Sequence, residues 1–116
     1  MRHRKIGKTL DRRKGAREAL LRGLLNNLVL YEHIQTTKAK AQAVRPLVEH
    51  LVTRAKENNL TAVRYLTARV YTEGARRKLL EVLGPRYKTR LGGYTRIIPL
   101  KRRAGDAAEI VRIEFV

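Results

Sequence analysis

Apolar residues recur at every third or fourth position over much of the chain, which is the spacing of one helix face. The longest such pattern covers residues 38–56 and predicts a core-facing helix after a short strand over residues 34–37. Its apolar stripe consists of Ala41, Val44, Val48, Leu51 and Ala55. Pro46 lies inside this helix, and because proline cannot donate a backbone hydrogen bond, we expect a kink or a break near Val44 and Arg45.

Three further helices are predicted from the same spacing. They cover residues 16–31, a segment that begins at about residue 61 and ends before residues 72–74, and residues 75–83. Gly84-Pro85 should end the last helix, since glycine commonly follows a helix and proline cannot continue one.

Alternating apolar residues near the C-terminus predict two strands, over residues 94–100 and 109–115. Gly105-Asp106 lies between them and predicts an antiparallel hairpin. Pro99 cannot donate to a neighbouring strand, which places the first strand of this pair at a sheet edge or at a bulge.

The order of elements is therefore helix, strand, three helices and two strands. The short strand over residues 34–37 has no neighbour in sequence, so one sheet must gather it with the C-terminal pair while the helices cover one face. We expect a two-layer α/β domain with a three-stranded sheet. At 116 residues the chain is one domain, here residues 16–116, preceded by a basic N-terminal arm over residues 1–15.

Charge narrows the classes of function. The chain has 27 Lys and Arg against 10 Asp and Glu, a formal charge of +17, and such an excess calls for a polyanion, with nucleic acid as the first candidate. No apolar run approaches the roughly 20 residues of a membrane span, and the N-terminus lacks a signal-peptide segment, so a cytoplasmic protein without a membrane partner is expected. With no cysteine and three scattered histidines, we expect no disulfide, metal site or cofactor.

The N-terminal arm and the start of the first helix carry one acid, Asp11, among many cations. The candidate RNA-binding residues here are Arg2, His3, Arg4, Lys5, Lys8, Arg12, Arg13, Lys14 and Arg17. The arm has too few apolar residues to form a core of its own. We therefore predict that it is disordered alone or becomes ordered on a partner. A solvated basic tail is the alternative.

A second candidate site lies where the long helix begins. It consists of Thr36, Thr37, Lys38 and Lys40. Thr37 is a plausible N-cap whose hydroxyl could accept from a first-turn amide. Because the helix macrodipole disfavours cations at this end, the two lysines suggest that an outside anion such as phosphate is held there. A solvated polar turn is the alternative.

The third candidate is a basic block near the C-terminus that contains no acid. Its cations are Arg86, Lys88, Arg90, Arg96, Lys101, Arg102 and Arg103. Gly92-Gly93 offers a backbone that a sugar-phosphate chain could approach closely. Tyr94 could stack on a base, although packing in the core is favoured for an aromatic at a strand start. The low aromatic content of 5% argues against stacking as the main mode of binding.

Taken together, several motifs resemble the bacterial large-subunit ribosomal protein L17 family over essentially the whole chain. The motifs are Met1-Arg2-His3, Arg17-Glu18-Ala19-Leu20, residues 34–41, Arg45-Pro46-Leu47-Val48-Glu49, Pro85-Arg86-Tyr87, Gly92-Gly93-Tyr94-Thr95-Arg96 and residues 102–106. The specificity lies in their order and spacing. The chain departs from the usual family pattern at Lys14-Gly15-Ala16, where many relatives have Ser-Ser-His, and in the length of its last loop.

The resemblance implies an α/β fold with a three-stranded sheet. It further implies a structural constituent of the large ribosomal subunit, without catalysis, that binds and stabilises large-subunit (23S) ribosomal RNA. Family members sit on the outer side of the subunit near the polypeptide exit, alongside other ribosomal proteins. No small-molecule substrate is implied.

Two rival functions fit the sequence less well. A DNA architectural protein would need dimer symmetry or apolar wedges for the minor groove, and neither is evident. An RNA-processing enzyme would need paired acids and bases or a carboxylate metal site, whereas the ten acids are scattered and His3, His33 and His50 show no pairing by spacing.

Overall fold

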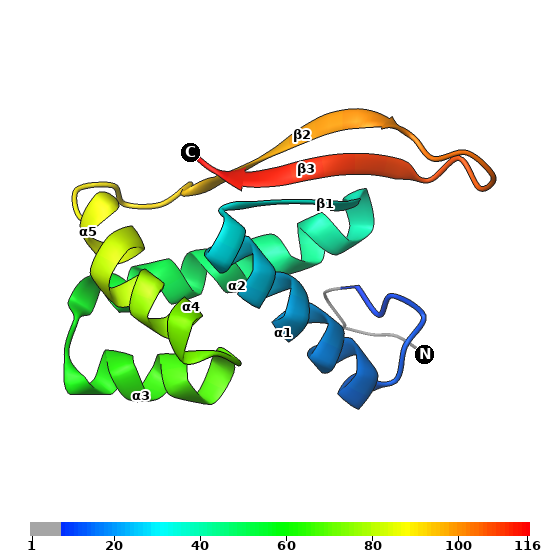
Figure 1. Cartoon of the computed structure of the whole chain (residues 1–116). Coiled ribbons are helices and arrows are strands. Elements are labelled where there is room, and N and C mark those ends of the chain that lie inside the picture. The colour runs from blue at the N-terminus through cyan, green and yellow to red at the C-terminus, as the bar shows by residue number, and fades with distance from the viewer. Residues whose placement is uncertain (1–7) are drawn as a thin grey trace.

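The computed structural model describes residues 8–116, so Arg2, His3, Arg4 and Lys5 of the arm lie outside the described residues. The elements are α1 (Lys14–Tyr31), β1 (His33–Thr37), α2 (Lys38–Glu57), α3 (Leu60–Arg69), α4 (Glu73–Lys78), the π turn η1 (Leu79–Leu83), α5 (Gly84–Arg86), β2 (Thr95–Arg102) and β3 (Glu109–Phe115). Because α4, η1 and α5 form one continuous helical segment, the predicted order of elements is confirmed. The helices lie on one side of the sheet, as the two-layer prediction required (Figure 1).

The sheet places the last strand in the middle. Its order is β1-β3-β2, and both neighbours run antiparallel to β3. Both parts of the expectation for Pro99 are met, because β2 is an edge strand and its register shifts between Pro99 and Lys101. On β3, Val111 and Ile113 are buried against the helices, whereas Arg112 between them is half-exposed.

Helix α2 is the centre of the core. Its buried residues are Ala41, Val44, Val48, Leu51, Val52 and Ala55. Of the two outcomes expected near Val44 and Arg45, the break is wrong, because α2 is one helix from Lys38 to Glu57, and the kink stays a prediction. Pro46 and Gln42 are both exposed, so the carbonyl of Gln42, which lacks a partner from proline, can bond to water instead.

The predicted helix end at Gly84-Pro85 is also wrong. The helical chain continues through η1, where the amide of Gly84 donates to the carbonyl of Leu79, and ends only after Arg86. Gly84 lies against the backbone of α2, since a Cβ there would be 3.1 Å from the carbonyl oxygen of Ala55. Pro85 is the second residue of α5, and the helical chain runs through it to Arg86 although proline has no amide proton to donate.

None of the helices within residues 8–116 combines the length and the apolar character needed to cross a membrane.

Candidate nucleic-acid interface

Strand β2 separates the C-terminal basic block into two groups. Register pairs Arg96 with Glu114 near one end of the sheet and Lys101 with Ile110 near the other. An eight-residue strand spans about 26 Å. The groups therefore lie at opposite ends of the molecule, one beside the loop after α5 and the other at the β2–β3 hairpin (Figure 1).

The hairpin end also holds the beginning of α2. β1 pairs Thr37 with Ile110, and Lys38 Nζ lies 3.4 Å from a Glu109 carboxylate oxygen. Arg102 reaches the same carboxylate over 3.9 Å. We call this set the hairpin-end surface, and it consists of Thr36, Thr37, Lys38, Lys40, Lys101, Arg102 and Arg103. The structure thus brings the second candidate site together with one half of the third.

At the tip of the hairpin, Arg103 forms a two-point ion pair with Asp106, with Nε and Nη2 at 3.1 and 2.6 Å from its two carboxylate oxygens. Asp106 also accepts from the amide of Ala108. Hydrogen bonds from Arg103 first, and then from this amide, lower the pKa of Asp106 to about 2. Much of the donor capacity of Arg103 is therefore used to shape the turn.

The expected cap at Thr37 is not formed. Thr37 occupies the N-cap position, but no side-chain hydrogen bond caps α2 within the described structure. The same residue ends β1, so its extended backbone is fixed by pairing with Ile110. The first-turn amides of α2 thus have no side-chain cap there, which leaves them to an outside acceptor.

The described part of the arm is exposed at Lys8, Arg12 and Arg13. α1 begins at Lys14, two residues earlier than expected, and the half-buried Arg17 donates to the carbonyl of Arg12 over 3.4 Å. In the view of Figure 1 these residues lie toward the same end of the molecule as the hairpin.

The opposite end is the loop-end surface, and it consists of Arg86, Lys88, Arg90, Gly92, Gly93 and Arg96. Arg86 donates to Glu32, and Lys78 lies 3.2 Å from the other Glu32 oxygen. The hydrogen bond from Arg86 is the largest cause that lowers the pKa of Glu32, and it also raises the pKa of Arg86. Arg96 pairs with Glu114 over 3.5 Å.

Tyr94 corrects the set of candidate contacts. Its side chain is fully buried, and its ring lies 5.2 Å from that of Tyr87 between ring centres. A residue with no exposed surface cannot stack on a base, so the packing interpretation is confirmed and the RNA contact proposed for Tyr94 is wrong.

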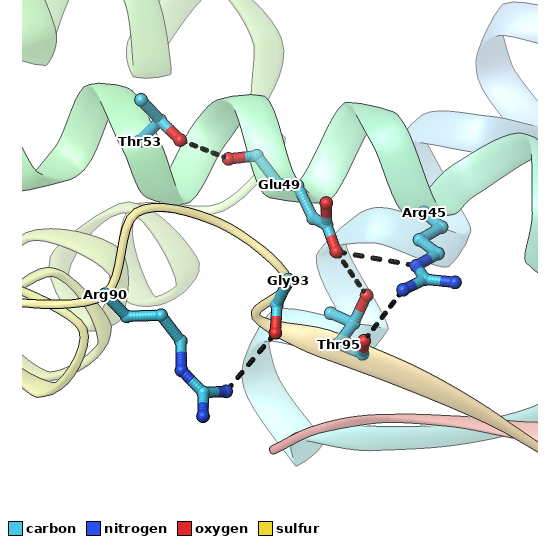
Figure 2. Close-up of polar contacts among 6 residues, drawn as sticks. All are labelled: Arg45, Glu49, Thr53, Arg90, Gly93 and Thr95. Carbon is cyan, nitrogen blue, oxygen red and sulfur yellow. Dashed lines mark hydrogen bonds and ion pairs between the residues drawn. The ribbon is translucent and has the colours of Figure 1, made fainter.

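Sequence reasoning missed the polar contacts that fix where β2 begins. Glu49 on α2 accepts from Thr95 over 3.0 Å and from Arg45 over 3.5 Å, and Arg45 also donates to the Thr95 carbonyl (Figure 2). Near the end of α2, Lys56 donates to the Arg90 carbonyl and to the Tyr94 hydroxyl. Apart from Arg45 and Glu49, which are four residues apart on α2, these partners are 34 to 50 residues apart, so no local sequence signal could have revealed them.

Within the described residues, no three His, Asp or Glu side chains gather in an arrangement that could hold a metal ion.

Comparison with known protein families shows to which family this domain, with basic surfaces at both ends of its sheet, belongs. A family model described as Ribosomal protein L17 matches residues 20–116. The chain belongs to the ribosomal protein L17 family. It is 47% identical over its full length to the large ribosomal subunit protein bL17 of Rickettsia bellii, covering 82% of that protein. The chain is also 46% identical to the bL17 protein of Gemmatimonas aurantiaca, of which it covers 98%. It is 46% identical to the bL17 protein of Solibacter usitatus, of which it covers 77%.

Membership of this family makes the chain a structural component of the large ribosomal subunit and not an enzyme. It acts in translation, and in bacteria its location is the cytoplasm, where ribosomes work.

Proposed function

We propose that the chain binds and stabilises large-subunit ribosomal RNA through cations at both ends of its sheet. In this proposal residues 1–15 form a basic arm that anchors the domain of residues 16–116. The RNA site lies near the polypeptide exit with other ribosomal proteins as neighbours, a placement that rests on the resemblance of the sequence to its family.

One observation carries the proposal. Lys40, Lys88 and Lys101 have no carboxylate within ion-pair distance in residues 8–116, whereas the arginines of the two surfaces mostly do. The paired arginines hold the surfaces in shape, and the lysines at both ends leave charge free for an outside anion. Phosphates of a folded RNA supply such anions along the whole backbone, so one RNA could contact both ends.

RNA fits these surfaces better than other polyanions. Folded RNA is recognised mainly through shape, phosphates and 2′-hydroxyls, which needs many cations and few aromatic side chains. The two groups of cations stand about one strand length apart on a rigid sheet, so they select a backbone of defined shape. Duplex DNA, with its regular spacing of phosphates, should fit them less well.

The test is to measure the affinity of the full chain for large-subunit ribosomal RNA and for duplex DNA of similar length between about 50 and 200 mM salt. A variant with Lys40→Ala, Lys88→Ala and Lys101→Ala should lower the salt slope on RNA by about 2 to 3, because each lost phosphate contact removes about 0.7 to 0.9. Arg64→Ala is the control, since Arg64 is an exposed cation on α3 outside both surfaces. Equal affinity for DNA, or an unchanged slope in the triple variant, would refute the proposal.

A further inference from the structure

Leu91 is the most exposed large apolar residue in the described chain, with 98% of its surface accessible. It stands in the loop between Tyr87 and Tyr94, within the loop-end surface. Single exposed apolar residues are common on proteins and need no explanation by themselves. What distinguishes Leu91 is how firmly the chain on both sides of it is held.

The residue before Leu91 is fixed by four contacts. The Arg90 amide donates to the Tyr87 carbonyl over 3.0 Å, and the Arg90 carbonyl accepts from Lys56 and from the Tyr94 hydroxyl. The Arg90 guanidinium then donates to the Gly93 carbonyl over 3.3 Å and closes the loop (Figure 2). Since Tyr94 is fully buried, this arrangement ties the loop to the core.

The residues after Leu91 leave open space beside it. Apart from the adjacent residues of the chain, no atom lies within 4 Å of the position that a Cβ would take at Gly92 or Gly93. Gly93 has a φ of +64°, a conformation that favours glycine and turns the chain back toward β2. A partner can therefore approach the Leu91 side chain and the neighbouring backbone together.

The charges next to Leu91 indicate which class of molecule would bind there. Lys88 and Arg90 precede Leu91 in the loop and are exposed, and the sequence has no acid between Glu81 and Asp106. A protein partner would have to bring its own acidic rim, whereas RNA carries a phosphate at every nucleotide. The wide, shallow minor groove of an RNA helix and an unstacked base both offer apolar surface next to phosphates.

We propose that Leu91 is an RNA-contact residue, which packs on a ribose or base while Lys88 pairs with a neighbouring phosphate. The inference rests on the proposed function and adds a short-range apolar contact to it. Because the loop is held in place before binding, little chain entropy is lost when the contact forms. The leucine thus contributes affinity that does not depend on counterion release.

Because this contact does not depend on counterion release, it can be recognised from the salt dependence of RNA binding. An apolar contact releases no counterions, so its loss lowers affinity by the same factor at every salt concentration and leaves the slope unchanged. Leu91→Ala in the full chain should weaken binding to large-subunit ribosomal RNA by about tenfold, which is the loss of most of one leucine contact. Lys88→Ala should instead flatten the slope by about 0.7 to 0.9.

Leu60→Ala is the matched control, because Leu60 is 64% exposed on α3, outside the loop-end surface, and its loss should leave RNA binding unchanged. Leu91→Ala should fold normally, since a side chain as exposed as that of Leu91 contributes little to stability. Equal melting temperatures of the variant and the unaltered chain will verify this.

Three results would overturn the inference. If Leu91→Ala binds like the unaltered chain while Lys88→Ala flattens the slope, the loop meets RNA without Leu91 and the proposed function stands. If Lys88→Ala and the triple lysine variant both leave the slope unchanged, the proposed function fails and this inference fails with it. Normal binding of Leu91→Ala to naked RNA, together with weaker retention in assembled large subunits, would assign the leucine to a protein neighbour.

Discussion

The hydroxyl of Thr95 donates a hydrogen bond to the Glu49 carboxylate over 3.0 Å and so joins the start of β2 to the middle of α2 (Figure 2). Thr95 is almost fully buried, and the Glu49 oxygen that accepts from it also faces Arg45. The Thr95 hydroxyl is the buried partner of this pair, and it needs its hydrogen bond because water cannot replace it there. This contact therefore sets the position of β2 and of the loop-end surface beside it.

Thr95→Val should lower the free energy of unfolding by about 1 to 2 kcal/mol, because valine keeps the shape of the side chain but cannot donate to Glu49. Chemical denaturation of both proteins measures this difference. Thr67→Val is the control, since Thr67 is exposed on α3 and its hydroxyl bonds only to the Val63 carbonyl in the same helix. Loss of the Thr67 hydroxyl should lower the free energy of unfolding by less than about 0.5 kcal/mol. Equal effects at the two positions would contradict the role given to Glu49.

Two glycines in helical segments should respond to alanine in opposite directions. At Gly84 a Cβ would lie 3.0 Å from the Leu79 carbonyl oxygen and 3.1 Å from that of Ala55, and both are backbone atoms that cannot move freely. Gly84→Ala should therefore lower the free energy of unfolding by about 1 to 2 kcal/mol. At Gly23 in α1 no atom lies within 4 Å, so Gly23→Ala should raise it by about 0.5 to 1 kcal/mol.

Thermal and denaturant unfolding of the two alanine variants provides the comparison. If Gly84→Ala is as stable as Gly23→Ala, then the close approach of η1 to α2 does not exist in solution. The position of Gly84 matters for the site, because Gly84 is the first residue of α5 and Arg86 is its last.

The contrast between these glycines shows what the sequence could and could not predict. The stripe of α2 and the edge position of Pro99 follow from local spacing and from chemistry that a single residue carries. The continuation of the helix past Gly84 depends on a backbone contact with Ala55, 29 residues earlier in the sequence, so a rule based on Gly-Pro alone gave the wrong end.

The candidate site likewise has features that the sequence could predict and features that it could not. Composition and charge runs indicated the candidate cations, whose contacts with RNA stay a prediction, and the motifs led to the right family. They could not show that β2 sends Arg96 and Arg102 to opposite ends, or that Arg103 is largely occupied by Asp106. Nor could they reveal Lys56 as the residue that holds the Arg90 loop, because its partners come together only in the folded chain.

The ion pair at the hairpin tip should be visible in a titration. The pKa of Asp106 is lowered to about 2, below the value of about 3.9 expected for an unfolded chain. A lowered carboxyl pKa stabilises the fold fully above the unfolded value, and this contribution is lost as the pH falls from about 4 toward 2. NMR detection of the Asp106 carboxyl should therefore give a midpoint near 2.

Arg103→Ala should raise the Asp106 midpoint toward its ordinary value, because Arg103 is the largest cause of the shift. Arg102→Ala serves as the control, since the Arg102 guanidinium faces Glu109 and the Ala107 carbonyl and not Asp106. An Asp106 midpoint that stays near 2 without Arg103 would show that the backbone amide of Ala108 alone holds the carboxylate.

The Tyr94 hydroxyl contacts the Arg90 loop, whereas the Tyr87 hydroxyl contacts the C-terminal residue. Tyr94→Phe removes the hydroxyl that donates to the Arg90 carbonyl, whereas Tyr87→Phe removes one that donates to the Val116 carbonyl over 2.7 Å. Both rings are buried and lie against each other, so both variants should lose about 1 kcal/mol of stability. Only Tyr94→Phe should speed hydrogen exchange at the Arg90 amide, which donates to the Tyr87 carbonyl, and weaken RNA binding, with an unchanged salt slope because no charge is lost. If Tyr87→Phe changes loop exchange and RNA affinity as much as Tyr94→Phe does, the loop depends on the general stability of the core, and its hydrogen bond to Tyr94 has no special part in holding it.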